Sequence, residues 1–479
     1  MVLLVLLSPK NLSELAASDG DVFMHWRFGE TMLQTREIIR KDIFSHTCYG
    51  RPVVPKEWLS QVLLALAGRL GGLTGLGVLA AVVIATTLAL MHRQLVRDGA
   101  DPLLSAGLVL VAVWAAQVHW HARPHVFSIL LLFFWNDVLR RFERTSNGWG
   151  CILALAGLTV LWVNLHGAYL AGFLTLGMYW TGAAIECLAR RKTQDAKPAQ
   201  RLLYWLSMAL LACAGVSLLN PSGYLLHVHN VQFLRSEFFV SILDEYRSMD
   251  FHTAGGRGFA VWLAITLTAA LWRRSALTPT AVVLLFGWSY LALYSVRNIP
   301  LMTIVVAPIL APMLSEGVRS FASDRWRDFL DRVRRIHEEA RGRFAALAIA
   351  LIVPAFIPVR AEVPEKKWPV AAVRFIQQHP QQFEGNMLNH YNLGSFLLWF
   401  LPEHKVFIDG RADSYGEVFV REYVDADMLS TNWVAIMEKY KVDWTLFGSE
   451  HALNRLLETN PGWRNVYSDG QVAIFTRDQ

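Results

Sequence analysis

Residues 71–93 read GGLTGLGVLAAVVIATTLALMHR, and this stretch indicates the class of protein to which the chain belongs. It holds no charged residue from Gly71 to Met91, and roughly 20 mainly apolar residues allow a helix to cross a bilayer. Arg93 follows directly, where a spanning helix would reach the polar surface of a membrane. The stretch therefore predicts a membrane-spanning helix.

Similar apolar runs recur along the chain until about residue 360. Of the 479 residues, 54% are hydrophobic and 18% are charged, whereas soluble domains carry roughly 25% charged residues. The opening residues MVLLVLLSPK are apolar but too few to cross a bilayer, so we expect a truncated first helix there. We expect about ten complete spans, at 71–92, 102–118, 124–139, 150–164, 167–189, 202–219, 258–272, 278–295, 299–315 and 343–359.

Basic residues gather in alternate loops between these spans, for example at Arg140 and Arg141 and again at Arg273 and Arg274. Because positively charged loops favour the cytoplasm, these loops are predicted to lie inside and the opposite loops outside. We therefore expect a multi-pass protein of the cytoplasmic membrane. The net charge of +6 has this origin, and we infer no nucleic-acid partner from it. The four cysteines form no CxxC motif, so a cysteine-ligated metal site is not indicated.

Three regions follow from this pattern. Residues 1–57 are the truncated first helix and the first outer loop, residues 58–360 are a transmembrane helical domain, and residues 361–479 are an extracytoplasmic domain. The helical domain begins with the amphipathic segment EWLSQVLLALAGRL, which we expect on the outer surface. The last region alternates helices with strands, among them NMLNH and KVFIDG, and this alternation predicts a small α/β layer with a largely parallel sheet.

Polar and charged side chains collect at the outer ends of the predicted helices. A charge near the hydrocarbon boundary is costly unless it is paired or hydrated, so these residues are candidates for a binding site. The helical part contributes His25, Arg123, His125, Asn164, His166, Asp244, Glu245 and Arg297 as candidate substrate-binding residues. The α/β part contributes Asn392, Asp409 and Arg411, which follow predicted strands.

Each candidate also has a structural interpretation. Histidines at helix ends are often interface anchors, and an arginine there can extend its charge to the membrane surface. Asp409 and Arg411 are close enough in sequence to form a pair that holds their loop in place. The His-x-His pairs at 119/121 and 227/229 allow a divalent metal, but the pattern does not support one, and the cofactor is unknown.

Asp21 stands in the stretch SDGDVFMHWRFGE, residues 18–30, on the predicted outer side. It is either the N-cap of a helix that starts near Val22 or a residue of the reaction. His25 follows four residues later and shares a face with Asp21 if the segment is helical.

Several outer segments together resemble a known family. They are DVFMHWRFGE, EWLSQVLLALAGRLGG, ARPHVFSILLLFFW, NLHGAYLAGF, LNPSGYLLHVHN and SVRNIPL, in this order along the chain. Their order resembles the GT-C superfamily of polytopic glycosyltransferases, and more narrowly bacterial membrane proteins with an RgtA/B/C/D-like glycosyltransferase domain. The resemblance implies a GT-C-like helical membrane fold, with an acid in the first outer loop as the catalytic residue. Asp21 matches that acid, and Glu57 matches a second one.

The resemblance further implies the transfer of a sugar from a polyprenyl-phosphate carrier to a glycan, lipid or protein acceptor, with inversion at the sugar. A carboxylate such as Asp21 would take the acceptor proton, and Arg123 and Arg297 would hold the leaving phosphate. Two alternatives remain, a transporter or flippase for a lipid-linked sugar and a non-catalytic envelope assembly protein. A transporter would place ionisable residues near the midplane of the membrane, whereas here they cluster at the helix ends.

Overall fold

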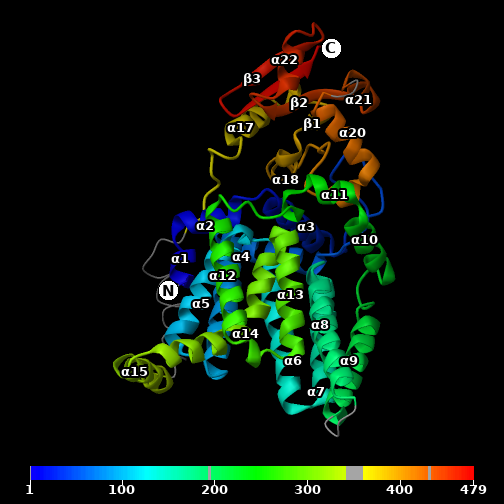
Figure 1. The fold of residues 1–479 in the computed structure, drawn as a ribbon. Helices are drawn as coiled ribbons and strands as arrows, with labels where there is room; N and C mark the ends of the chain where they lie inside the picture. The colour runs from blue at the N-terminus through cyan, green and yellow to red at the C-terminus, as the bar shows by residue number, and fades with distance from the viewer. Residues whose placement is uncertain (1, 192–195, 341–359, 430–432, 479) are drawn as a thin grey trace.

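The computed structural model describes residues 2–191, 196–340, 360–429 and 433–478. They form a bundle of long helices that carries a smaller α/β layer at one end (Figure 1). We call this end of the bundle the upper end and the opposite end the lower end.

The long helices of the bundle coincide with the first nine predicted spans, while the tenth prediction, at 343–359, lies outside the described residues. Among the described residues, six helical segments are long and apolar enough to cross a membrane, at 58–97, 102–119, 148–165, 197–216, 254–272 and 296–321. The chain is therefore built as a multi-pass membrane protein. The bundle helices are α4 (Trp58–Arg97), α5 (Pro102–Ala116), α6 (His125–Thr145), α7 (Gly148–Leu165), α8 (Tyr169–Ala189), α9 (Ala196–Val216), α12 (Ala254–Trp272), α13 (Pro279–Tyr294) and α14 (Ile299–Phe321).

Helix α4 is two helices joined at a kink. The backbone leaves helical geometry at Gly71 and Gly72, and Gly72 has a φ of 58° and a ψ of −143°, a conformation that side chains disfavour. The kink separates the amphipathic segment from Glu57 onward from the first long apolar run, as the sequence predicts. The upper part of α4 packs against α3 (Asp21–Thr35) so closely that a Cβ on Gly29 would lie 1.9 Å from the carbonyl oxygen of Gln61.

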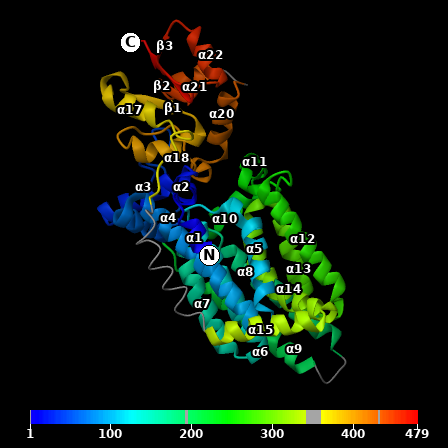
Figure 2. The same ribbon diagram turned by 90° about the vertical axis from the view of Figure 1, so that its left-hand side faces the viewer.

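Shorter helices connect and flank these elements. Helix α15 lies across the lower end of the bundle in Figure 2. The remaining helices outside the α/β layer are α1 (Val2–Leu6), α2 (Pro9–Ala17), η1 (Gln117–His119), α10 (Tyr224–Arg235), α11 (Glu237–Ile242), η2 (Asp244–Tyr246), η3 (Arg274–Ala276), η4 (Val296–Asn298) and α15 (Asp324–Ala340).

The α/β layer holds a four-stranded sheet in the order β1-β2-β4-β3. Only the β1–β2 pair is parallel in this sheet, since β2–β4 and β3–β4 are antiparallel, and the predicted largely parallel sheet is wrong. The elements of the layer are α17 (Val370–Gln378), η5 (Pro380–Gln382), β1 (Asn386–Asn389), α18 (Tyr391–Phe400), α19 (Ala412–Tyr415), α20 (Glu417–Asp427), α21 (Trp433–Lys439), β2 (Val442–Gly448), α22 (Ala452–Glu458), β3 (Trp463–Ser468) and β4 (Val472–Arg477).

The segment KVFIDG, predicted as a strand, joins no strand of this sheet. The side chain of Asn389 accepts a hydrogen bond from the Phe407 N–H and donates one to the Ile408 carbonyl. On this side a side chain, and not a neighbouring strand, pairs with the backbone of the segment. On its other side, Val406 exchanges backbone hydrogen bonds with Phe44 and His46 of the first loop.

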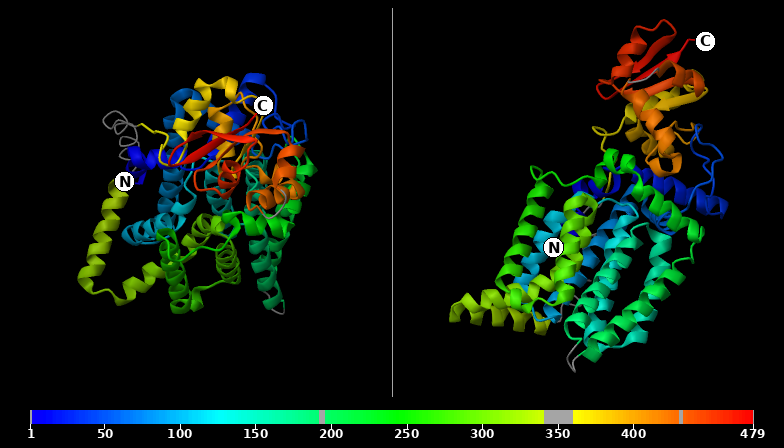
Figure 3. Two further views of the ribbon diagram at one scale, coloured as in Figure 1. Left: turned by 90° about the horizontal axis from the view of Figure 1, so that it is seen from above. Right: turned by 45° about the vertical axis from the view of Figure 1, so that its right-hand side comes forward.

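The first loop and the α/β layer share one hydrophobic core. Phe23 of α3 packs edge-on against the rings of Trp368 and Phe396, at centroid distances of 5.9 and 5.5 Å. Figure 3 shows the first segments of the chain between the bundle and the α/β layer. The domain boundaries at 57/58 and 360/361 stay predictions. Helix α3 and the loop after it share the core of the α/β layer, whereas Leu12 and Leu15 of α2 belong to the core of the bundle.

Candidate functional site

A cluster of acids and arginines lies at the upper end of the bundle, beneath the α/β layer. Asp19 stands in the turn between α2 and α3, whereas Asp21 is the first residue of α3 and follows the N-cap, Gly20, so Asp21 is not the N-cap. The Asp21 N–H donates to the Asp19 carboxylate over 2.9 Å, which fixes the turn. Arg123 precedes α6, in a turn that is tied to α2 by a hydrogen bond from the Ala122 N–H to the Leu15 carbonyl. Glu245 stands in η2.

Arg123 holds three carboxylates at once. Its Nη1 lies 2.8 Å from Asp19 and 2.6 Å from Glu245, and its Nη2 lies 3.0 Å from Asp21. Arg297 reaches the other oxygen of Glu245 at 3.7 Å, and its guanidinium lies 4.5 Å from the centre of the Tyr246 ring. The two arginines that the sequence singled out are thus brought together through Glu245. We call these five residues, Asp19, Asp21, Arg123, Glu245 and Arg297, the Arg123 cluster.

Asp21 also contacts the α/β layer. The Ser395 hydroxyl donates to Asp21 Oδ1 over 3.0 Å and accepts from the Gly410 N–H over 3.0 Å. A Cβ on Gly410 would lie 2.0 Å from Asp21 Oδ1, so only a glycine allows this approach. The end of the KVFIDG segment, at Gly410, therefore closes directly over the carboxyl group.

The two aspartates of the turn differ in acidity. Burial raises the pKa of Asp21 to about 7, against the attraction of Arg123 and with added repulsion from Asp19 and Glu245. Burial acts in the same direction on Asp19, but Arg123 and His121 outweigh it and lower the pKa of Asp19 to about 2. One carboxylate thus stays ionised, while its neighbour can exchange a proton near neutral pH.

Glu57 forms a second group beside the first, which we call the Glu57 group. Its carboxylate lies 3.9 Å from Nδ1 of His25 and 3.5 Å from Nε2 of His166, and His166 also hydrogen bonds to Ser128 over 2.8 Å. Burial raises the pKa of Glu57 and lowers the pKa of His25 to about 3, so the imidazole is neutral. The segment is helical, as the shared face of Asp21 and His25 requires, but the described contacts of His25 are to Glu57 and Gln61.

A lysine next to Glu57 connects the first loop to the α/β layer. Lys56 forms an ion pair with Asp413, which also accepts a hydrogen bond from His229 of α10 over 2.8 Å. Lys56 and His229 together lower the pKa of Asp413 against the effect of its burial. This bridge fixes the backbone at Lys56 and thereby the position of Glu57.

Three other candidates, His125, Asn164 and Asp244, lie apart from these groups or already have all their hydrogen-bonding atoms paired. His125 contacts the backbone carbonyl of His119. Asn164 is saturated, because its amide donates to the carbonyls of Val160 and Leu219 and its oxygen accepts from Trp58. Asp244 points to solvent with 89% of its side chain exposed and pairs with Arg247 at 3.0 Å.

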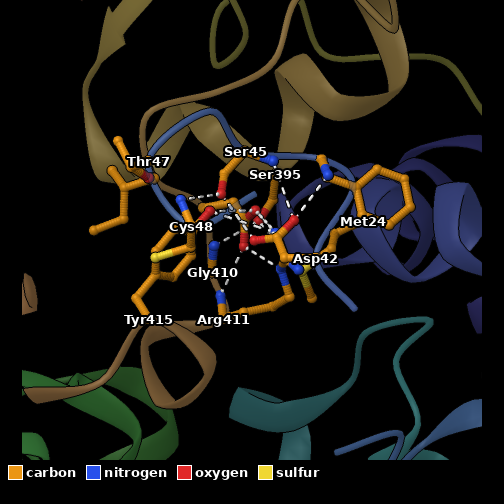
Figure 4. Close-up of polar contacts among 12 residues, drawn as sticks. Met24, Asp42, Ser45, Thr47, Cys48, Ser395, Gly410, Arg411 and Tyr415 are labelled. Atoms are coloured by element: carbon orange, nitrogen blue, oxygen red, sulfur yellow. Dashed lines mark hydrogen bonds and ion pairs between the residues drawn. The ribbon is translucent and has the colours of Figure 1, made fainter. Parts of the chain in front are cut away.

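Two candidates of the α/β layer, Asp409 and Arg411, belong to a buried network of hydrogen bonds and ion pairs. Arg411 forms a buried bidentate pair with Asp409 at 2.8 and 2.5 Å, and Tyr415 donates to the same carboxylate over 2.9 Å. Arg411 also reaches Asp42 of the first loop at 3.4 Å, as can be followed in Figure 4. This network favours the structural interpretation of the Asp409–Arg411 pair. Asn392 is exposed at the start of α18.

The carboxylates of the Arg123 cluster do not form a ready metal site, because the guanidinium of Arg123 stands between them. Among the described residues, His390, Asp427 and His451 of the α/β layer are the group whose ligand atoms come within 4.8 Å of one another. Both imidazoles accept a backbone N–H at Nδ1, over 3.3 Å each. A neutral imidazole that accepts at Nδ1 carries its proton on Nε2 and cannot bind a metal there, so we derive no step through a metal.

Sequence reasoning missed Asp19, Lys56 and Ser395. The Asp-Gly-Asp spacing at 19–21 was a usable signal for Asp19, since it places two carboxylates in one turn. Lys56 and Ser395 gave no such signal, because each acts through a partner more than 350 residues away.

Solved structures share this fold. The chain aligns with the Archaeoglobus fulgidus oligosaccharyltransferase in the apo form at 15% identity and a TM-score of 0.58, over 91% of this chain and 66% of that one. It aligns with the oligosaccharyltransferase AglB from Archaeoglobus fulgidus, in complex with an inhibitory peptide and a dolichol-phosphate, at 13% identity and a TM-score of 0.58, over 100% and 74% of the two chains. The chain thus spans just under two thirds of the length of the first of these structures.

No protein-family model matches the chain, and no curated protein matches its sequence. At these identities the likeness establishes a common fold, and it confirms the predicted GT-C-like helical membrane architecture with a small C-terminal α/β layer. The narrower RgtA/B/C/D-like membership stays a prediction.

Proposed function

We propose that the chain is a membrane glycosyltransferase of the GT-C type that moves a sugar from a polyprenyl-phosphate donor to an acceptor hydroxyl or amide. The observation that carries this proposal is the Arg123 cluster, which combines a carboxyl group of raised pKa with two arginines at one end of a membrane bundle. One of the fold neighbours is in complex with a dolichol-phosphate, a ligand of the donor class.

Asp21 is the base in this mechanism. A carboxyl group with a pKa near 7 has the basicity suited to general-base catalysis near neutral pH. Asp21 takes the acceptor proton while the acceptor atom bonds to the anomeric carbon of the sugar. The bond between that carbon and the phosphate oxygen breaks, and the phosphate leaves on its lipid carrier. One displacement of this kind inverts the anomeric centre.

Arg297 is the residue best placed to hold the leaving phosphate. Within the described residues its one ion pair is the long contact to Glu245, at 3.7 Å, which leaves guanidinium donors for phosphate oxygens. Arg123 makes three short ion pairs, so its first role is to fix the acids and its second is to add positive charge beside the phosphate. Glu57 would act beside Asp21 as the second acid, held by His25 and His166.

The donor enters from the membrane and the acceptor from the space beneath the α/β layer, which we propose is extracytoplasmic. A transporter for the same lipid-linked sugar would place ionisable residues near the midplane, beside broken helices. The Arg123 cluster instead lies at the upper end of the bundle, which favours chemistry at one membrane face.

The test is a transfer assay with the purified protein in liposomes and a panel of polyprenyl-phosphate sugars. Release of the carrier phosphate with at least one donor is the expected result, and Glu245→Gln should reduce it, because the two arginines lose their common carboxylate. Asp244→Asn is the matched control. Asp244 precedes Glu245 in the sequence but its side chain is exposed, so this variant should leave release unchanged. Absence of release with every donor, from protein that melts cooperatively, would refute the proposal.

A further inference from the structure

The lower end of the bundle holds a pocket of about 180 Å³ between the ends of α4 and α6. Charged side chains form most of its lining, namely Arg97, Arg140, Arg141 and Arg144 together with Asp98 and Asp137. A cavity needs roughly 10–15 Å³ to hold one water, so this pocket has room for a group much larger than water.

Only part of the positive charge is neutralised within the pocket. Asp98 lies 2.7 Å from Arg140 and 2.8 Å from Arg144. Asp137 lies 2.5 Å from Arg141 and accepts a hydrogen bond from the Gln94 amide over 2.8 Å. Four arginines against two aspartates leave two positive charges, and within the described parts of the chain Arg97 pairs with no carboxylate.

The aspartates and Arg140 are largely buried, whereas Arg141 and Arg144 extend to the mouth of the pocket. The Asp98 side chain is 7% exposed, whereas the side chains of Arg141 and Arg144 are 62% and 59% exposed. Their position near the C-terminal ends of α4 and α6 suits the negative end of a helix dipole, but this interaction does not require a hollow between them. Guanidinium groups that are held in place and partly exposed match the oxygens of a phosphate.

We propose that this pocket binds a phosphate group, carried either by an anionic phospholipid or by free phosphate. The lining residues come from the C-terminal parts of α4 and α6 and from Asp98 after α4, and phospholipid headgroups would surround these helix ends in a membrane. This site is separate from the Arg123 cluster at the opposite end, and the proposal does not depend on the proposed transfer reaction.

The experiment measures phospholipid binding to the full chain by native mass spectrometry from detergent. Phosphatidylglycerol should bind in preference to phosphatidylcholine. Arg97→Gln should weaken this binding about tenfold, the scale of one lost hydrogen bond to a charged group. Arg93→Gln is the matched control, since it removes the same charge one turn earlier on α4 and does not line the pocket.

Arg141→Gln is the second variant and should also weaken phosphatidylglycerol binding, because Arg141 faces the pocket mouth. The melting temperature of each variant establishes that it is folded. Displacement of phosphatidylglycerol by excess inorganic phosphate would identify free phosphate as the source, and failure of displacement would identify the lipid. Both results support the phosphate site. Equal binding of the two phospholipids with no effect of inorganic phosphate, or equal loss in the Arg97 and Arg93 variants, would overturn it.

Discussion

Asp21 lies between one cation and two further acids, and its environment sets its acidity. Arg123 favours the ionised form, while burial, Asp19 and Glu245 favour the protonated form, and the net effect raises the pKa from 3.8 to about 7. Below this pKa the group carries a proton and cannot act as a base. Above it the group is ionised and competent.

The pH dependence of transfer follows from the upward shift of the Asp21 pKa. Activity should rise with pH, with the midpoint of the rising limb at about 7 instead of near 4, the range of an ordinary carboxyl group. The measurement is the rate of carrier release over about pH 5 to 9, at saturating and at limiting donor. A rate that stays flat down to the acid end of this range would show that no group of raised pKa limits the reaction.

Substitution of Arg297 should weaken donor binding even where the positive charge is kept. Arg297→Lys keeps the charge but loses the planar fork, so donor affinity should fall about tenfold while the protein keeps its melting temperature. Arg247→Lys is the matched control, because Arg247 lies in the same outer region and pairs with the exposed Asp244. Donor affinity measured by titration checks the prediction, and equal affinities in the two variants would remove Arg297 from the phosphate site.

Much of the cluster was predictable at the residue scale, since Asp21, Arg123, Glu245 and Arg297 all stand at helix ends, as Glu57 of the neighbouring group does. What the sequence did not provide is the pairing among them. The bond that Arg411 makes with Asp409 and the saturation of Asn164 depend on tertiary contacts, and both were open alternatives from sequence alone.

At the scale of elements, the end of the KVFIDG segment, at Gly410, is the part that brings the α/β layer to the cluster. This segment has the apolar, β-branched character of a strand, but the side chain of Asn389 and the backbone of the first loop take the hydrogen bonds that a ladder would need. Long-range partners of this kind leave no periodic signal. The kink in α4 did leave a signal, because two glycines stand where an amphipathic pattern changes to an apolar one.

Gly410→Ala tests the role of this segment end. The added Cβ would lie 2.0 Å from Asp21 Oδ1 and would displace either the segment end or the carboxyl group. A displacement on the order of 1 Å at a reacting group can lower turnover by about 100-fold, and we expect a loss of this size. Turnover and melting temperature are measured beside Gly470→Ala, whose Cβ would meet open space. Equal turnover in the two variants would separate the segment end from the site.

At the scale of the whole molecule, the basic loops and the α/β layer lie at opposite ends of the bundle, so the charge pattern predicts the orientation in the membrane. A reporter active only in the cytoplasm should stay silent when it is fused at Gln479. The same reporter inserted between α12 and α13, at Arg274 of the lower end, should be active. A signal from the Gln479 fusion would invert the proposed topology and place the cluster on the cytoplasmic side.

The fold class was largely predictable at this scale because spanning helices need long apolar runs, and nine of them coincide with helices of the described bundle. The direction of the strands was not predictable in this way. Strands β3 and β4 pair as neighbours in an antiparallel hairpin, and the alternation of helices and strands does not reveal such a pair. The core that the first loop shares with the α/β layer joins residues at the two ends of the chain, and no local pattern reports it.

The most direct test of Asp21 as the base is the variant Asp21→Asn, measured in the liposome transfer assay beside its melting temperature. Asn nearly conserves the shape of the side chain and can accept the hydrogen bond from Ser395, but it cannot take a proton at neutral pH. We predict a folded variant whose transfer rate falls by about 100-fold or more, the usual scale of a general base, while Asp244→Asn transfers at the wild-type rate. Wild-type transfer by Asp21→Asn with an unchanged melting temperature would contradict this role and show that Asp21 serves only the structure of the turn.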